Sequence, residues 1–217
     1  MKVADLPRLA AISHKHGALL LVDNTFCSPY LCNPIKFGAD MVIHSATKFI
    51  GGHGDVMAGI VATTAKLKDE MVRLNKLLGS SLGPFEAWLA HRGLKTLPLR
   101  LRQQCQNALE IATWLQNHPQ ISRVHYAFLP DHPQFALMHQ LSGGKGGGAV
   151  LSFEVRGAGK QEMFALMDAL ELIQPATSLG DIYSLMLYPA ISSHRSLTAE
   201  DRHDLGIGDG LLRLSAG

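Results

Sequence analysis

The first part of the chain combines one helical pattern with several short apolar runs. Residues 5–16 place apolar side chains on one helical face, which predicts a helix that ends at Gly17. Three apolar runs of strand length follow, "ALLLVDN", "GADMVIHS" and "MAGIVAT". Such runs are typical of strands buried on both faces of a parallel sheet, and turns with proline and glycine separate them. This order of elements predicts an α/β layer architecture.

From Pro84 the pattern becomes helical and then mixed. Residues between Pro84 and Pro119 have helical periodicity, which Pro98 interrupts. Further helices are predicted over residues 159–170 and directly after Thr198, which is a suitable N-cap. Strands are predicted for the runs "ISRVHY", "GGAVLSFEV", "LELIQPAT" and "GLLRLSAG".

The change of pattern predicts two domains with a boundary near residue 97. Residues 1–97 then form one α/β unit, and residues 98–217 form a smaller α+β domain. A parallel sheet of so few strands leaves its edges open. We therefore expect residues 1–97 to be only part of a larger domain.

The composition argues against several classes of protein. With 47% hydrophobic and 18% charged residues over 217 positions, the chain can build a sizeable globular core. Lysine and arginine are scattered and the net charge is only +2, so no nucleic-acid-binding surface is expected. The longest apolar runs, such as "ALLLV", are too short to span a bilayer. We recognise no secretory signal and expect a cytoplasmic protein.

The cysteines agree with that location. Cys27, Cys32 and Cys105 are an odd number and lack the CxxC spacing, which favours reduced thiols. A zinc site made by Cys27, Cys32 and a histidine is the alternative, although the spacing differs from that of known zinc ligands. We expect no metal site.

The segment "MVIHSATKFIGGHG" places one lysine, Lys48, after an apolar run. It has three interpretations. The ammonium could simply extend from the strand end into solvent. A phosphate-binding loop of the nucleotide type needs glycine before the lysine and a hydroxyl residue after it, whereas Thr47 and Phe49 stand there. In the third interpretation an apolar setting lowers the pKa of Lys48, so that the amine acts as nucleophile and base.

The neighbours of Lys48 favour the third interpretation. Ser45 and Thr47 alternate with the lysine, so that their hydroxyls could bind a phosphate beside it. Asp23 ends the preceding apolar run and is expected to be a buried carboxylate. Ligands of open α/β sheets bind at the carboxyl ends of strands. An amine, phosphate-binding hydroxyls and a carboxylate for the ring nitrogen are what pyridoxal 5'-phosphate requires.

The stretch "LLVDNTFCSPYLCNPIKFGADMVIHSATKFIGGHGDVMAGIV" closely resembles the Cys/Met-metabolism family of pyridoxal-phosphate enzymes. The resemblance continues through "LGPFEAWLAHRGLKTLPLRL", "SLGD" and "GLLRLSAG". It implies the aspartate-aminotransferase-like fold, fold type I. Residues 1–97 would then be the C-terminal part of the large cofactor-binding domain, and residues 98–217 the small domain without its final helix.

The resemblance also implies roles for the residues around the cofactor. Lys48 matches the family's Schiff-base lysine, and Asp23 matches the carboxylate that pairs with the pyridine nitrogen. Ser45 and Thr47 match the hydroxyls that bind the phosphate. Thr25 matches a residue near the cofactor ring.

Two further residues match the family's substrate-binding positions. Ser178 of "SLGD" is expected beside the active lysine, and Arg213 of "LLRLSAG" is expected to bind the α-carboxylate of an amino acid. The guanidinium group suits such a two-pronged contact. His44, His53 and His91 have no role in the family, and we expect them to be structural.

The resemblance implies a carbon–sulfur lyase that releases a 2-oxo acid, ammonia and a thiol by γ-elimination from methionine, homocysteine or cystathionine. Members that act on cystathionine often carry glutamate where this chain has Thr177. The alternative is γ-replacement on an activated homoserine ester, as in cystathionine γ-synthase or O-acylhomoserine sulfhydrylase. The family further implies a homotetramer built from two dimers.

A non-catalytic remnant is a third hypothesis. The family's N-terminal half holds a tyrosine that stacks on the cofactor ring, a glycine-containing phosphate turn, and residues that reach the neighbouring subunit's site. We find no match to those segments, and we expect the chain to be truncated at both ends.

Overall fold

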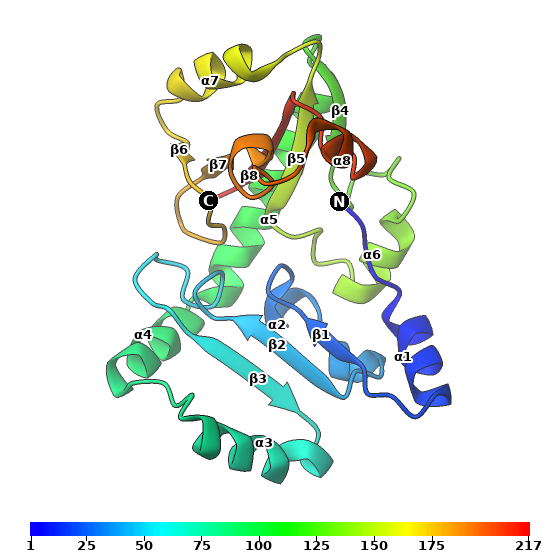
Figure 1. Ribbon diagram of the computed structural model, residues 1–217, viewed down its shortest axis with the longest axis vertical. Helices are drawn as coiled ribbons and strands as arrows, with labels where there is room; N and C mark the ends of the chain where they lie inside the picture. The colour runs from blue at the N-terminus through cyan, green and yellow to red at the C-terminus, as the bar shows by residue number, and fades with distance from the viewer.

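A computed structural model describes residues 1–217. The chain forms two β-sheets at opposite ends of the molecule, and the long helix α5 (Leu97–Gln116) runs between them (Figure 1). The predicted boundary near residue 97 coincides with the beginning of α5. The division into domains stays a prediction.

The N-terminal sheet has the strand order β1-β2-β3. Its strands are β1 (Leu21–Asp23), β2 (Met41–Ser45) and β3 (Gly59–Thr63). The helices of this part are α1 (Leu6–Lys15), α2 (Ser28–Leu31), the 3₁₀ helix η1 (Pro34–Phe37), α3 (Ala65–Leu78) and α4 (Pro84–Leu94). β1 runs parallel to β2, whereas β3 is antiparallel to β2. The expectation of three parallel strands was therefore wrong for β3, because an apolar run does not record strand direction.

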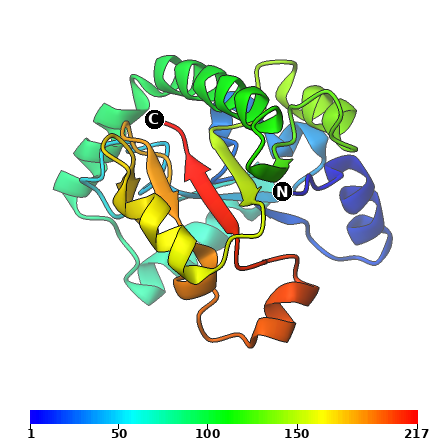
Figure 2. The ribbon, with the colours of Figure 1, turned by 90° about the horizontal axis from the view of Figure 1, so that it is seen from above.

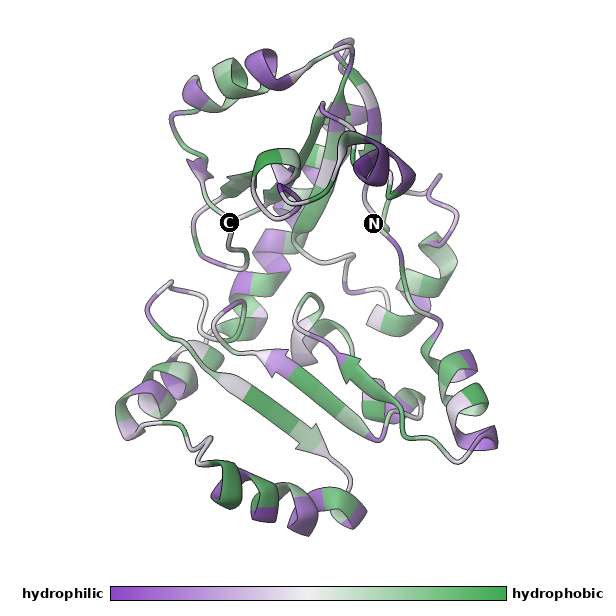
Figure 3. Ribbon diagram, viewed as in Figure 1, coloured by the Kyte–Doolittle hydropathy of each residue, from purple (hydrophilic) through white to green (hydrophobic).

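The burial of this sheet also differs from the expectation. Val42 is buried, but Leu21 is 51% exposed and Val61 is 52% exposed. Figure 3 shows these three strands as largely apolar ribbons. The runs were expected to be buried on both faces, but within residues 1–217 no element covers β1 and β3 to that extent.

The C-terminal sheet has the strand order β4-β5-β8-β7-β6. Its strands are β4 (Ile121–His125), β5 (Val150–Val155), β6 (Gln174–Pro175), β7 (Leu185–Leu187) and β8 (Leu211–Ser215). β8 is antiparallel to both of its neighbours, β5 and β7. The other elements are α6 (Phe135–Ser142), α7 (Lys160–Asp168), the 3₁₀ helix η2 (Pro189–Ile191) and α8 (Ala199–Asp204). The strand predicted for "LELIQPAT" is reduced to the two residues of β6.

Helix α5 belongs to two hydrophobic cores. Its first half packs against the segment that follows β2, through Leu97, Leu101, Cys105, Ala46, Phe49 and Ile50. Its second half lies against the five-stranded sheet (Figure 2), with buried residues Ala108, Ala112, Leu115, Leu151 and Leu212. Because one helix serves both cores, it fixes the segment after β2 relative to the C-terminal sheet.

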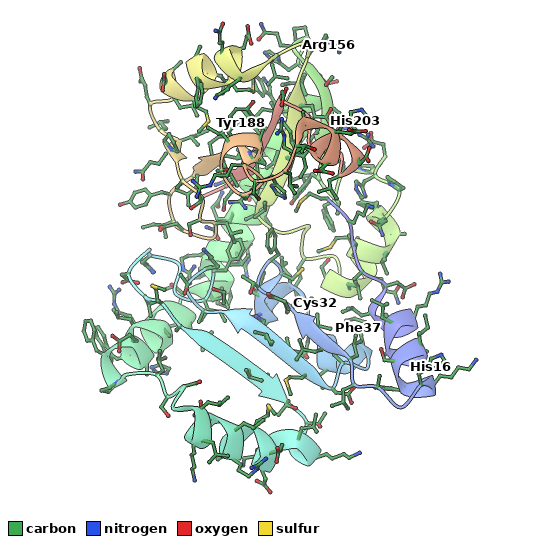
Figure 4. All side chains as sticks on the ribbon, viewed as in Figure 1. His16, Cys32, Phe37, Arg156, Tyr188 and His203 are labelled. Atoms are coloured by element: carbon green, nitrogen blue, oxygen red, sulfur yellow. The ribbon has the colours of Figure 1, made fainter.

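The state of the cysteines and the character of the helices can be compared with what the sequence predicted about disulfides, metal sites and membrane spans. All three cysteines are free, and burial raises the pKa of Cys27 to about 12. Cys32 lies in a small apolar cluster with Phe37 (Figure 4). The structure contains no group of three or more histidine, cysteine or carboxylate side chains arranged to hold a metal ion. None of the helices combines the length and apolar character needed to cross a membrane.

Candidate active site

Two loops from distant parts of the sequence meet between the sheets. The lysine loop (residues 46–54) follows β2, and the serine loop (residues 177–183) joins β6 to β7. The Nζ atom of Lys48 donates a hydrogen bond of 2.9 Å to Oγ of Ser178, although the two residues are 130 positions apart. The structure thus brings together the predicted catalytic lysine and one of the two predicted substrate-binding residues.

Gly180 allows this close approach. Its φ is +81°, and a Cβ atom there would lie 2.6 Å from the backbone nitrogen of Phe49 and 3.0 Å from the carbonyl carbon of Lys48. Glycine alone tolerates both the dihedral angle and the contact. A backbone hydrogen bond of 3.0 Å from Ile182 N to Gly52 O joins the loops a second time.

Arg213 holds the serine loop from the other side. It lies in β8, and its Nη2 donates to the carbonyl oxygens of Thr177 at 3.0 Å and Ser178 at 2.8 Å. Its Nε atom is buried and has no hydrogen-bond partner in the chain. Arg213, the second predicted substrate-binding residue, and Lys48 therefore both contact the serine loop. The buried Nε of Arg213 remains available to donate a hydrogen bond.

The electrostatics of the site shift the equilibrium of Lys48 toward the neutral amine. Burial, and second the positive charge of Arg213, lower the pKa of Lys48. A depressed pKa increases the fraction of neutral amine, which is the nucleophilic form. Burial also lowers the pKa of Arg213. Arginine keeps its charge at physiological pH even so.

Asp23, Thr25 and Ser45 are linked at the carboxyl ends of β1 and β2. Thr25 N donates to Oδ1 of Asp23 at 2.9 Å, and Ser45 N donates to Oγ1 of Thr25 at 2.7 Å. Asp23 is aligned with Ile43 in the parallel register. The expectation of a buried carboxylate was wrong, because Asp23 is exposed on the open sheet. Lys48 follows Ser45 by three positions, so the predicted cofactor residues share one end of this parallel pair.

The hydroxyl of Thr47 already has a backbone partner. Its Oγ1 accepts a hydrogen bond of 3.0 Å from Ala58 N, next to the beginning of β3. Ser45 is half-buried at the end of β2. Of the two hydroxyls predicted to bind phosphate, that of Thr47 therefore also anchors the lysine loop to the neighbouring strand.

A cleft of about 490 Å³ opens beside the two loops. Thr47 and Ser178 line it, together with Gly54, Asp55, Val56, Met57, Gln174, Ala176, Leu179, Asp181 and Leu185. A larger cleft of about 1000 Å³ lies next to β4 and contains none of the predicted site residues. Of the predicted site residues, only Thr47 and Ser178 line the smaller cleft. We place the candidate site beside it, because Ser178 contacts the amine of Lys48, and a perturbed amine with convergent polar groups marks an active site better than size does.

These residues fit a phosphorylated aldehyde cofactor by their chemistry. Lys48 offers an amine of lowered pKa, and hydroxyl groups at positions 45 and 47 stand next to it in the sequence. A carboxylate ends the adjacent parallel strand, and an arginine donor is buried without a partner. The set therefore suits pyridoxal phosphate, and the individual contacts stay predictions.

Sequence reasoning missed two polar residues of α5 that contact these loops. Arg100 Nη1 donates to the carbonyl oxygen of Phe49 at 2.8 Å, and Gln104 Nε2 donates to that of Asp181 at 2.6 Å. A signal was present, because Gln104 falls among the apolar residues of the buried stripe of α5. A polar side chain at such a position needs a partner.

Comparisons with known proteins agree on one family. A sequence model for "Cys/Met metabolism PLP-dependent enzyme", where PLP is pyridoxal phosphate, matches residues 1–217. The chain is 44% identical over 216 residues to an O-succinylhomoserine sulfhydrylase of Pseudomonas aeruginosa. That alignment covers 100% of the present chain and 53% of the sulfhydrylase. It is also 44% identical over 222 residues to an L-methionine gamma-lyase of Pseudomonas putida, and this alignment covers 100% of the present chain and 54% of the lyase.

A solved structure confirms the expected fold. Cystathionine gamma synthase from Xanthomonas oryzae pv. oryzae, in complex with aminoacrylate and cysteine, superimposes with a TM-score of 0.93 at 43% identity. The match covers 100% of this chain and 55% of the solved chain. The chain thus spans about half the length of the relatives it matches. With the family model matched from end to end and relatives above 40% identity, the chain belongs to the Cys/Met-metabolism family of PLP-dependent enzymes.

Proposed function

We propose that this chain carries the lysine of a PLP-dependent enzyme that cleaves the carbon–sulfur bond of a sulfur amino acid by γ-elimination. One water would be consumed, and the products would be a 2-oxo acid, ammonia and a thiol. The observation that supports the proposal most directly is the 2.9 Å contact between Lys48 Nζ and Ser178 Oγ, beside Arg213. When bound, the cofactor supplies an electron-withdrawing ring that stabilises negative charge at the substrate's Cα.

Lys48 would hold the cofactor and move protons. Its Nζ would hold the cofactor at the aldehyde group, and as a free amine it would accept a proton from the substrate's Cα. γ-Elimination also requires a proton to leave Cβ, so the same amine must reach both carbons. The hydroxyl of Ser178 would orient the amine between them. Asp23 would pair with the ring nitrogen, with Thr25 nearby.

Arg213 would bind the α-carboxylate of the substrate. One nitrogen of its guanidinium is engaged by two backbone carbonyls, which fixes the plane of the group. Its remaining donors include the buried Nε without a partner. A fixed guanidinium presents two donors to a carboxylate at little entropic cost. Ser45 and Thr47 would bind the cofactor phosphate.

γ-Replacement is the second candidate reaction. The sulfhydrylase and the methionine gamma-lyase are equally similar to this chain, at 44% identity each, so similarity does not separate replacement from elimination. The residue before Ser178 is Thr177, which offers no charge to a second substrate ammonium. That feature supports a substrate with a single amino group, such as methionine, homocysteine or an activated homoserine ester.

Binding of the cofactor is tested first. The purified chain is mixed with pyridoxal phosphate, the visible absorbance is recorded, and borohydride is added to fix any bond before peptide mass analysis. We expect the label on Lys48 and its loss in Lys48→Ala. Lys68→Ala, which changes an exposed lysine of α3, is the control. A wild-type chain that takes no label would contradict the proposal and favour the non-catalytic remnant.

The reaction is tested next. Methionine or homocysteine is supplied without a second thiol, and the 2-oxo acid is measured. In a parallel reaction an acylated homoserine is supplied with a thiol. A 2-oxo acid in the first reaction supports γ-elimination, whereas turnover only in the second supports γ-replacement. Light scattering of the labelled chain tests the homotetramer that the family resemblance supports.

A further inference from the structure

We propose that Arg100 and Gln104 are positioning residues that hold the lysine loop and the serine loop in register, so that Ser178 meets Lys48. The proposal deepens the proposed function and rests on it for the role of Lys48. The two residues are four positions apart on α5, so they project from the same side of one rigid helix. Each contacts a different one of the two loops.

Arg100 fixes the backbone directly after Lys48. Its Nη1 donates to Phe49 O at 2.8 Å, and its Nη2 donates to Ile50 O at 3.3 Å and to Gly93 O at 2.8 Å. The planar guanidinium thus joins the lysine loop to the end of α4. A lysine in its place would offer a single ammonium centre and could not reproduce this fork.

The lysine loop is shaped to accept Arg100. Gly52 has a φ of +72°, and a Cβ atom there would overlap the guanidinium. A Cβ at Gly93 would overlap the backbone of Ile50 and Gly51. Two glycines are therefore needed for α4, the guanidinium and the lysine loop to come this close.

Gln104 fixes the serine loop. Its side chain is 2% exposed, and its Nε2 donates to Asp181 O at 2.6 Å. Asp181 is three residues beyond Ser178, and the next residue, Ile182, bonds to Gly52 of the lysine loop. Gln104 lies about one turn of α5 beyond Arg100. One helix therefore sets the backbone on both sides of the Lys48–Ser178 hydrogen bond.

A purely structural role is the competing explanation, since Arg100 also satisfies a carbonyl at the end of α4. The two explanations differ in what a variant changes. Loss of a structural contact lowers overall stability and leaves the environment of Lys48 as it was. Loss of a positioning contact separates the two loops, lets water reach Lys48 and changes the reactivity of its amine.

The test compares Arg100→Lys and Gln104→Met with matched controls on the same helix. Arg102→Lys and Gln103→Met replace exposed residues of the same types. Hydrogen exchange is measured for peptides covering residues 46–54 and 177–183. We expect amide exchange in both peptides to accelerate roughly fivefold or more in the two test variants, and not in the controls.

The second readout is the pH profile of labelling at Lys48 by pyridoxal phosphate and borohydride. Burial lowers the pKa of Lys48, so looser loops should move the midpoint of the profile to higher pH. Thermal unfolding is recorded for every variant, because a positioning role predicts the shift even where the melting temperature is retained.

Wild-type exchange and a wild-type midpoint in both test variants would overturn the proposal, even if their melting temperatures fell. If Arg100→Lys does not fold, Gln104→Met decides alone, since methionine preserves the volume of the buried side chain. If the wild-type chain takes no label, the proposed function fails. The exchange measurement then still decides whether the two residues position the loops.

Discussion

The amine of Lys48 and the hydroxyl of Ser178 are joined by a hydrogen bond of 2.9 Å that crosses from one sheet of the molecule to the other. Lys48 follows β2 of the three-stranded sheet, and Ser178 precedes β7 of the five-stranded sheet. The contact therefore depends on how the two parts of the chain pack. Substitutions that alter the packing of the loops should change the chemistry at Lys48.

Ser178→Ala should weaken cofactor binding without unfolding the chain. In the proposed role the hydroxyl holds the amine in the orientation that the cofactor-bound chain uses, so its loss, worth about 1 kcal/mol, should raise the dissociation constant for pyridoxal phosphate roughly fivefold. Titration followed by visible absorbance measures it. Ser193→Ala removes an exposed hydroxyl in the same part of the chain and is the control. Equal affinities in wild type and Ser178→Ala would show that the hydroxyl does not orient the amine.

Gly180→Ala should destabilise the chain more than a comparable glycine substitution. A non-glycine residue at positive φ costs about 1–3 kcal/mol by itself. At Gly180 the added Cβ also meets Phe49 N and the carbonyl carbon of Lys48, whereas nothing lies within 4 Å at Gly157, whose φ is +64°. Gly157→Ala therefore measures the dihedral cost alone. Urea denaturation should give a clearly larger loss for Gly180→Ala, and equal losses would refute the close approach of the loops.

Periodicity in the sequence predicted many elements but not their relations. The helix α1 and the strands β2 and β8 were found from local patterns, because side-chain burial repeats along each element. Helix α3 was not predicted, and in the structure none of its residues is buried. The antiparallel direction of β3 leaves no trace in a short apolar run.

In the candidate site, too, local features could be predicted from the sequence, whereas contacts between distant residues could not. Lys48 and its neighbours could be proposed from the sequence, since a lone amine after an apolar run is a local feature. The contact of Arg100 with Phe49 O joins residues 51 positions apart, and no local pattern encodes it. The prediction that Asp23 is buried was wrong, because Asp23 is exposed. An apolar run indicates which residues favour burial, but it does not show whether other elements of this chain cover them.

Arg213→Met should reduce both stability and affinity for amino acids. The variant leaves the carbonyl oxygens of Thr177 and Ser178 without their donor, which costs about 1–3 kcal/mol in the free energy of unfolding. It also removes the proposed partner of the substrate carboxylate. Urea denaturation measures the first effect, and the spectral change of the PLP-loaded chain on adding methionine measures the second.

Two further variants separate these effects of Arg213. Arg213→Lys keeps the charge but lacks the planar fork of donors, so it should retain only part of the affinity for methionine. Arg8→Met, at an exposed position of α1, should change neither quantity. An Arg213→Met variant that binds methionine as the wild type does would remove Arg213 from the proposed substrate site.

His44 should make the chain less stable in acid. Burial is the main cause that lowers the pKa of His44, although the charge of Asp23 acts in the opposite direction. The Nδ1 atom is buried without a partner. Below the ordinary pKa of about 6.5 the unfolded chain binds a proton that the folded chain does not, so stability falls as the pH decreases through this window. Above it the contribution of His44 is constant.

The variant His44→Gln tests this dependence. Glutamine does not titrate, so the free energy of unfolding, measured in urea at a series of pH values, should fall less steeply below pH 6.5 than in the wild type. His203→Gln replaces an exposed histidine of α8 and should leave the wild-type slope unchanged. If His44→Gln and the wild type lose stability in parallel on acidification, protonation of His44 is not coupled to unfolding, and another group with a lowered pKa must account for the slope.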